Sequence, residues 1–154
     1  MSLAALDGPR ITLSAPQGGI VIVHFFATWC ETCGPELHAL QRLQSDFGSC
    51  VTIIIIDVGE PADRIRRYFQ TFPARPRIGL DADRSVARAW GVYALPSSFV
   101  LDHSLAPLWQ AIGDVPWDEA AVRQRLSKAG GTGQSSDPRQ PTSPLDAKGK
   151  CHDH

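Results

Sequence analysis

The chain has 154 residues, of which 43% are hydrophobic and 20% are charged, and its formal net charge is −1. This length favours one domain that buries its own core without the help of disulfides. The 15 basic and 16 acidic residues are interspersed, so no basic stripe indicates a nucleic-acid or membrane-surface binder, and a protein or small-solute partner is expected. The start "MSLAALDGPR" lacks the features of a signal peptide, and no stretch approaches the ~18 apolar residues of a membrane span.

The first third of the chain predicts a hairpin followed by a βαβ unit. "LDGPRITLS" indicates half of a hairpin with its turn at Asp7-Gly8. The apolar runs "GGIVIVHFFAT" and "CVTIIIIDV" predict two strands that are buried on both faces. Between them, "GPELHALQRLQSDFG" predicts a helix that stops at Gly48 and places four apolar residues on one face, namely Leu37, Leu40, Leu43 and Phe47. Strand, helix and strand in this order predict a parallel pair.

The rest of the chain predicts three further helices and two strands. "EPADRIRRYFQTF" is helical with one aromatic-rich face, "FPARPRIGLD" is a Pro-interrupted crossing, and "ADRSVARAWGV" is a short helix ending near Gly91. "SSFVLD" and "LAPLWQAIG" predict an antiparallel hairpin, and "PWDEAAVRQRLSKAGG" predicts a terminal helix that begins with Pro116. From about Gly130 the composition changes to Gly, Ser, Pro, Gln and Thr, which predicts a folded domain over 1–129 and a flexible tail over 130–154.

Cys30 and Cys33 form a C-x-x-C pair at the start of the first long helix. Residues three apart there lie near the ~5.5 Å Cα separation that a disulfide prefers. The free N–H groups and the dipole of a helix N-terminus favour an anion, which lowers the thiolate pKa of Cys30. We therefore expect Cys30 to be the nucleophile and Cys33, one turn further in, to be the resolving thiol.

Other readings of the cysteine pair stay open at this point. A zinc site needs two more ligands, and the tail's "CHDH", residues 151–154, offers the candidates; copper or zinc handling by that tail is an alternative function. A structural disulfide that closes so short a loop would stabilise little. A non-redox interaction module with a vestigial pair is the third possibility. The βαβ context favours redox chemistry over all of these.

Several separate motifs resemble a known family. "FFATWCETC", "ALPSSFVLD" and Gly113 resemble the thioredoxin superfamily, and "VTIIIIDVGEPADRIRRYFQTF" followed by "RIGLDADRSVARAWGVYALPSSFVLD" resembles its TlpA/ResA/DsbE-type thiol-disulfide oxidoreductases. The resemblance spans roughly residues 6–129. It implies an α/β, thioredoxin-like fold, in which helices flank a central mixed β-sheet and an extra helical insertion lies in the middle of the chain.

The resemblance also implies roles for single residues. Cys30 matches the attacking cysteine and Cys33 the resolving one, while Trp29 matches the aromatic that shields the rim of the site. Pro96 matches a cis-proline whose preceding residue, Leu95, offers its backbone to an extended substrate. Glu36 matches an acidic residue that moves a proton to or from Cys33. Judged from the residues alone, a trans proline and a solvated helix carboxylate are the commoner situations for these two positions.

Two features depart from the family pattern. Gly34-Pro35 replaces the basic residue that often follows the second cysteine, and Pro35 removes an N–H from the first helical turn. His24 stands where thioredoxin has a buried Asp. It would either exchange protons with Cys33 or stabilise its thiolate, or it is a hydrogen-bonded core histidine, which is the commoner case.

The expected function is thiol-disulfide exchange through a Cys30/Cys33 cycle that requires no metal or organic cofactor. Glu31, next to Cys30, disfavours the thiolate and therefore favours a reductant. The resemblance implies a protein disulfide as substrate, with the haem-binding cysteines of apocytochrome c as one option, and a dithiol donor protein upstream, which can be membrane-bound. It also implies a periplasmic or other extracytoplasmic, membrane-anchored location with a leader outside this chain; a cytoplasmic location stays open.

Overall fold

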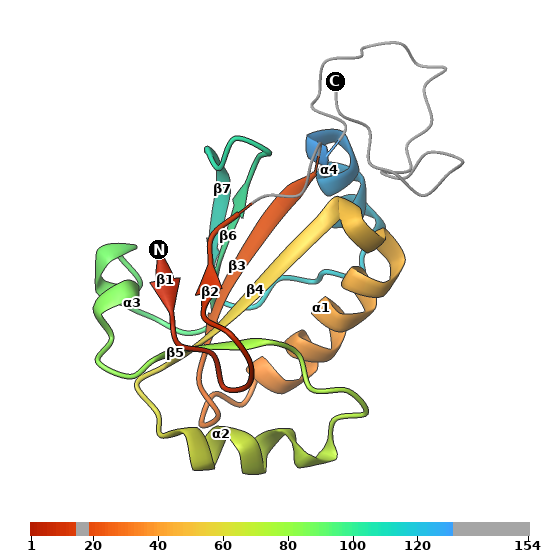
Figure 1. Cartoon of the computed structure of the whole chain (residues 1–154). Helices are drawn as coiled ribbons and strands as arrows, with labels where there is room; N and C mark the ends of the chain where they lie inside the picture. The colour runs from red at the N-terminus through yellow and green to blue at the C-terminus, as the bar shows by residue number, and fades with distance from the viewer. Residues whose placement is uncertain (15–18, 131–154) are drawn as a thin grey trace.

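The computed structural model describes residues 1–14 and 19–130, which form one mixed five-stranded sheet with helices on its faces (Figure 1). The strand order is β5-β4-β3-β6-β7. The parallel part contains β3 (Ile20–Phe26), β4 (Val51–Val58) and β5 (Ile78–Asp81), and the antiparallel part adds β6 (Ser97–Leu101) and β7 (Pro107–Ile112). A separate hairpin joins β1 (Ser2–Leu3) to β2 (Ile11–Thr12). The helices are α1 (Cys33–Phe47), α2 (Ala62–Tyr68), α3 (Ser85–Ala89) and α4 (Ala120–Gly130), and short 3-10 turns cover Gly48–Cys50 and Phe69–Thr71.

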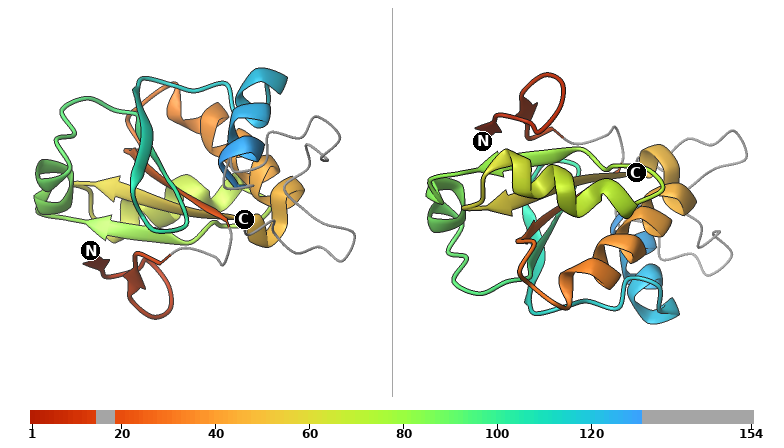
Figure 2. Two further views of the ribbon diagram at one scale, coloured as in Figure 1. Left: turned by 90° about the horizontal axis from the view of Figure 1, so that it is seen from above. Right: turned by 90° about the horizontal axis from the view of Figure 1, so that it is seen from below.

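Strand β3 is buried along its whole length because both faces of the sheet are covered. Its residues alternate between two apolar clusters: Ile20, Ile22 and Phe26 belong to one, and Val21, Val23 and Phe25 to the other. The first cluster includes residues of α1, α2 and α4, and the second joins the β1–β2 hairpin to α3. Figure 2 shows α1 and α4 on one side of the sheet and the β1–β2 hairpin on the other.

Helix α1 places one apolar face on the sheet, as its sequence predicts. Leu37, Leu40 and Leu43 are at most 1% exposed, and burying such a side chain stabilises the fold by about 1.5–3 kcal/mol each. The helix ends at Gly48, whose φ of 58° lies in the left-handed region that glycine adopts without steric strain. The N-H of Gly48 still bonds to the Gln44 carbonyl, which closes the last turn.

Two elements differ from the sequence prediction. Ile78–Asp81, within the predicted Pro-interrupted crossing, is strand β5, which pairs in parallel with Ile55–Val58 of β4. Its outer edge is covered because Leu6 N donates to the Ile78 carbonyl and Leu80 N to the Ala4 carbonyl. The terminal helix begins at Ala120 rather than near Pro116; residues 117–119 form a turn that places the Trp117 side chain in the core.

The segment formed by α2 and β5 lies between β4 and α3. It agrees with the central insertion that the family resemblance implied. Because α2 carries Ile65 and the following turn carries Phe69, both of which pack in the α1-side cluster, the insertion extends the core beyond β4. The predicted tail lies outside the described residues, so the boundary at 129/130 stays a prediction.

Candidate active site

Cys30 and Cys33 lie where strand β3 leads into helix α1, and they form a disulfide with a Cα–Cα distance of 5.4 Å. A tight turn holds them, because Cys30 N donates to the Ala27 carbonyl and Cys33 N to the Cys30 carbonyl. Cys30 is 8% exposed and Cys33 is fully buried, which is the order that the sequence predicted. Thr32, the residue before the helix, makes no capping bond with its side chain. Cys33 N is already bonded within the turn and Pro35 has no N–H, so it is mainly the dipole of α1 that favours a thiolate at Cys30.

Leu95 and Pro96 lie beside this turn, just before strand β6. The bond between them is cis. Ser97, the next residue, pairs with Phe25 near the end of β3, so the sheet register brings the proline to the strand end that carries the cysteines. Leu95 and Trp29 line the same groove, and the side chain of Trp29 is 65% exposed there. The structure therefore brings the four predicted residues to the same end of the sheet, where β3 ends and β6 begins: Trp29, Cys30, Leu95 and Pro96.

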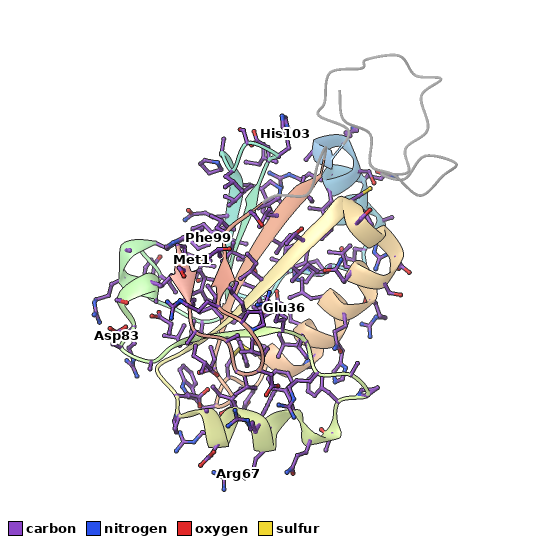
Figure 3. The ribbon with its side chains drawn as sticks, in the orientation of Figure 1. Met1, Glu36, Arg67, Asp83, Phe99 and His103 are labelled. Carbon is purple, nitrogen blue, oxygen red and sulfur yellow. A yellow bond between two sulfur atoms is a disulfide. The ribbon has the colours of Figure 1, made fainter. Side chains whose placement is uncertain are left out.

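Glu36 is buried between α1 and the sheet (Figure 3) and is not a solvated helix charge. Trp117 Nε1 donates to its Oε2 at 2.7 Å and Val115 N donates to the same oxygen at 3.1 Å. Burial raises the pKa of Glu36 to about 7; the bonds from Trp117 and Val115 lower it in part, and the negative charge of Asp114 adds to the rise. Glu36 follows Cys33 by three residues on the helix, so both lie on the same side, one turn apart.

His24 is a neutral core histidine. It has no exposed surface, and its Nδ1 lies 2.8 Å from Ser98 Oγ. Burial lowers the pKa of His24 to about 3, so the 3.8 Å approach of Nδ1 to Glu36 Oε2 is not an ion pair near neutral pH. The reading in which a charged His24 stabilises a thiolate therefore disagrees with its surroundings.

Two further buried carboxyl groups, Asp57 and Glu60, lie at the end of β4 and were not predicted from the sequence. Glu60 accepts hydrogen bonds from Thr28 N at 2.7 Å and Thr28 Oγ1 at 2.6 Å, two residues before Cys30. Asp57 is 1% exposed and lies next to Glu60, whose side chain and backbone are its polar neighbours. Burial, followed by the neighbouring Glu60, raises the pKa of Asp57 to about 9.

These two carboxyl groups share one proton near neutral pH. Burial acts to raise the pKa of Glu60, but the bonds from Asp57 and Thr28 outweigh it and lower the pKa. A protonated Asp57 therefore donates to an ionised Glu60, which in turn fixes the backbone of Thr28. The signal that could have revealed the pair is the acidic residue inside "TIIIIDV", a strand otherwise apolar on both faces.

The fold and the cysteine pair together define a thioredoxin-like protein. Residues 1–105 match the family described as AhpC/TSA, which is more than half of the chain, and the chain belongs to that family. Among curated relatives it is 32% identical over 97 residues to the thiol-disulfide oxidoreductase ResA of Bacillus subtilis, covering 62% of this chain and 54% of that protein. It is 28% identical over 106 residues to the thiol:disulfide interchange protein CycY of Rhizobium leguminosarum, covering 68% and 56%. The chain thus spans little more than half the length of these two relatives.

Solved structures confirm the fold. A thiol:disulfide interchange protein of DsbE type from Chlorobium tepidum superposes with a TM-score of 0.75 at 23% identity, over 84% of this chain and 92% of that one. StoA from Bacillus subtilis superposes with a TM-score of 0.65 at 19% identity, over 77% and 96%. The predicted thioredoxin-like α/β fold with a mixed sheet is therefore confirmed.

Within residues 1–14 and 19–130, no helix combines the length and the apolar character needed to cross a membrane. The same residues contain no group of three or more His, Cys, Asp or Glu side chains arranged to hold a metal ion. The "CHDH" of the tail lies outside the described residues, so the metal-handling alternative stays a prediction.

Proposed function

We propose that this protein is a thiol-disulfide oxidoreductase that acts through a Cys30/Cys33 dithiol-disulfide cycle. The observation that carries the proposal is the pairing of Cys30 with Cys33 at the N-terminus of α1, with Cys30 the more exposed sulfur. The names of the curated relatives ResA and CycY support the same chemistry.

In the proposed cycle, two exchanges move two electrons to the substrate. The Cys30 thiolate attacks one sulfur of the substrate disulfide; a Cys30–substrate bond forms, the substrate S–S bond breaks, and the other substrate sulfur leaves as a thiolate. Cys33, once deprotonated, then attacks Cys30 Sγ. The Cys30–Cys33 bond forms, the mixed disulfide breaks, and the second substrate sulfur leaves as a thiolate.

Glu36 is the proposed acceptor of the Cys33 proton. A carboxyl group whose pKa is about 7 is partly ionised at neutral pH, so it can take a proton from a thiol and later return it. It lies one helical turn from Cys33, and its Oε1 receives no hydrogen bond from a donor of the described residues, so this oxygen is the one that would take the proton. On this basis Glu36→Gln should prolong the life of the mixed disulfide without preventing its formation.

Trp29, Leu95 and Pro96 are the proposed substrate-binding residues. Leu95 is a half-buried residue that lines the groove together with Trp29, and its backbone would pair with an extended segment of the substrate. The exposed Trp29 ring, next to Cys30 in the chain, would pack on the bound substrate and limit the access of water to the mixed disulfide.

We further propose that the protein works as a reductase of extracytoplasmic protein disulfides, with cytochrome c maturation substrates as one option. A second dithiol protein, which can be membrane-bound, would return the Cys30–Cys33 disulfide to the dithiol, since the cycle itself consumes one dithiol per turnover. No metal or organic cofactor takes part in this scheme, and nucleic acid is not an expected partner.

Trapping of the mixed disulfide tests the proposal. Cys33→Ser leaves the attacking thiol without its resolving partner, so it should accumulate a covalent complex with a disulfide-containing protein, visible on non-reducing gels and released by a reductant. Cys30→Ser keeps Cys33 but should trap nothing, which makes it the matched control. A protein that traps no substrate and does not reduce insulin would contradict the proposal and favour a non-redox interaction module.

A further inference from the structure

A groove of about 390 Å³ lies next to the cysteine pair, between the loop that carries Trp29 and the segment that leads from α3 to Leu95. Its floor is apolar and includes Val58, Val92 and Leu95. Two large aromatic side chains are exposed at it: Trp29 at 65% and Tyr93 at 81%. A surface with this shape and composition suits an extended peptide segment with an apolar side chain.

Two arginines, Arg84 and Arg88, give the same groove a positive rim. Both are exposed, and neither forms an ion pair with a carboxylate of the described residues, whereas Arg42, Arg66, Arg75 and Arg123 all do. The positive charge of Arg88 lowers the pKa of Asp83, which lies in the loop before α3 (Figure 3). Asp83 forms no ion pair with Arg88, and its Oδ1 accepts a hydrogen bond from Ser85 N. Glu31, the exposed acid beside Cys30, does not line the groove. Within the part of the chain that the structure describes, neither guanidinium group is held in an ion pair, so both are available to an acidic ligand.

The backbone holds both arginines in place. Asp81 Oδ1 accepts from Val86 N and Asp81 Oδ2 from Ala87 N, which anchors α3 to the end of β5. Arg84 has a left-handed φ of 64°, and its N–H bonds to the Asp81 carbonyl. Gly59, at the end of β4, has no side chain, and a Cβ there would overlap Arg84 Nε. The missing side chain leaves room for the Arg84 guanidinium to lie across this strand end.

We propose that this groove selects protein disulfides whose cysteine lies in an acidic, extended segment, with an Asp or Glu side chain that binds Arg84 and Arg88 and an apolar side chain that packs between Trp29 and Tyr93. The proposal rests on the thiol-disulfide exchange proposed above and names its substrate class. Arginine suits this task because its planar guanidinium donates two parallel hydrogen bonds to a carboxylate. Each bond of a charged pair gains more where an apolar floor excludes water.

The test compares disulfide-linked peptides that are identical except for one residue near the cysteine, which is Asp, Asn or Lys. We expect the wild-type protein to reduce the Asp peptide with a kcat/KM roughly tenfold higher than the Asn peptide, the size of effect that one charge-assisted hydrogen bond produces, and to reduce the Lys peptide most slowly. The double variant Arg84→Gln/Arg88→Gln should lose this order, and Arg84→Lys/Arg88→Lys should keep part of it. The matched control, Arg67→Gln/Lys128→Gln, removes the same charge at exposed positions outside the groove and should keep the full preference.

A small neutral disulfide, bis(2-hydroxyethyl) disulfide, separates this inference from the function on which it rests. All variants should reduce it at the wild-type rate, because it does not reach the arginines. If the wild-type protein reduces the three peptides equally well, or if the control double variant loses the preference as fully as the groove variant, the inference is wrong while the exchange chemistry stands. If neither the peptides nor the small disulfide is reduced, both proposals fail.

Discussion

Trp117 Nε1 donates a hydrogen bond to Glu36 Oε2 at 2.7 Å and so joins two residues that are 81 positions apart in the chain. Both side chains are buried, and the backbone N–H of Val115 bonds to the same carboxyl oxygen. Donors that point at a carboxylate favour its ionised form, whereas burial opposes it. The pKa of about 7 is the outcome of this opposition, so Trp117 acts as a positioning residue that tunes Glu36.

Trp117→Phe removes the indole donor and keeps an aromatic ring of similar shape. We expect the pKa of Glu36 to rise above 7, since a bond that favours the ionised form is lost. The pH profile of mixed-disulfide resolution should move to higher pH by the same amount, as measured by quenched-flow trapping at a series of pH values. Trp109→Phe is the matched control, because Trp109 stacks on Trp117 and its Nε1 has no hydrogen-bond partner among the described residues. An equal shift in both variants would mean that packing, not the hydrogen bond, sets the profile.

Glu36→Gln should change the pH dependence of stability. The native pKa of about 7 exceeds the ordinary value of 4.5, so the native state binds more protons than the unfolded state between these two values. The stability that protonated Glu36 contributes is therefore complete below pH 4.5 and is lost as pH rises through 7. The difference in unfolding free energy, wild type minus variant, should fall across this window with a slope of at most about 1.4 kcal/mol per pH unit.

Urea denaturation at pH 4.5, 5.5, 6.5 and 7.5 measures this difference. The pKa of His24 is lowered to about 3, so His24 makes the unfolding free energy rise with pH below about 6.5. Because His24 Nδ1 lies 3.8 Å from Glu36 Oε2, the two groups couple, and the fall between pH 6.5 and 7.5, where His24 contributes little, is the decisive part of the curve. A difference that stays constant or rises with pH would contradict the assignment of a raised pKa to Glu36.

Asp57→Asn should stabilise the protein at pH 8. In the wild type a native pKa of about 9, against an ordinary 3.8, means that stability is lost as pH rises from about 4 to 9, because the unfolded state releases the proton first. Asparagine carries no proton to lose, and its amide can donate to Glu60 as the protonated carboxyl does. The variant's advantage in unfolding free energy should grow from pH 5 to pH 8. Asp63→Asn, at a side chain that is 93% exposed, should change stability by less than about 0.5 kcal/mol at either pH.

Glu31→Gln should raise the reduction potential of the Cys30/Cys33 couple. Removing a negative charge next to Cys30 stabilises the thiolate and hence the reduced form, and a stabilised reduced form makes the couple more oxidising. For the wild type we expect a potential nearer to thioredoxin's ~−270 mV than to DsbA's ~−120 mV. Ser45→Lys adds the same unit of charge at the far end of α1, roughly 18 Å from its first residue, and should leave the potential unchanged. Equilibration with a glutathione buffer gives the value, and a wild-type potential near that of DsbA would contradict the reductase direction.

The parts of the fold that follow from local patterns could be predicted from the sequence. Strands β3 and β4 are long apolar runs and α1 repeats leucine at helical spacing, so each carries its own signal. Strand β5 could not be found in this way, because it has four residues and owes its place to pairing with β4 and to the N-terminal segment that covers its edge. Acidic residues after Pro116 predict a helix start near that proline, but they fit equally well the turn over residues 117–119 that precedes α4 in the structure.

In the candidate site too, the local feature could be predicted from the sequence and the long-range contacts could not. The spacing of Cys30 and Cys33 fixes their approach within one turn, so sequence alone sufficed for the disulfide. The burial of Glu36 depends on Trp117, and the raised pKa of Asp57 depends on how Glu60 and the loop at Thr28 cover the end of β4. These are long-range contacts of single side chains, and no periodicity in the sequence encodes them.

Alkylation of the reduced protein tests the central claim most directly. The rate of iodoacetamide labelling of each cysteine, followed by mass spectrometry from pH 4 to pH 10, reports which sulfur ionises first. We predict that Cys30 is labelled first, with a pKa below the ~8.5 of a free cysteine, and that buried Cys33 reacts much more slowly. Labelling of Cys33 before Cys30, or a Cys30 that titrates at ~8.5, would contradict the account of Cys30 as an activated nucleophile.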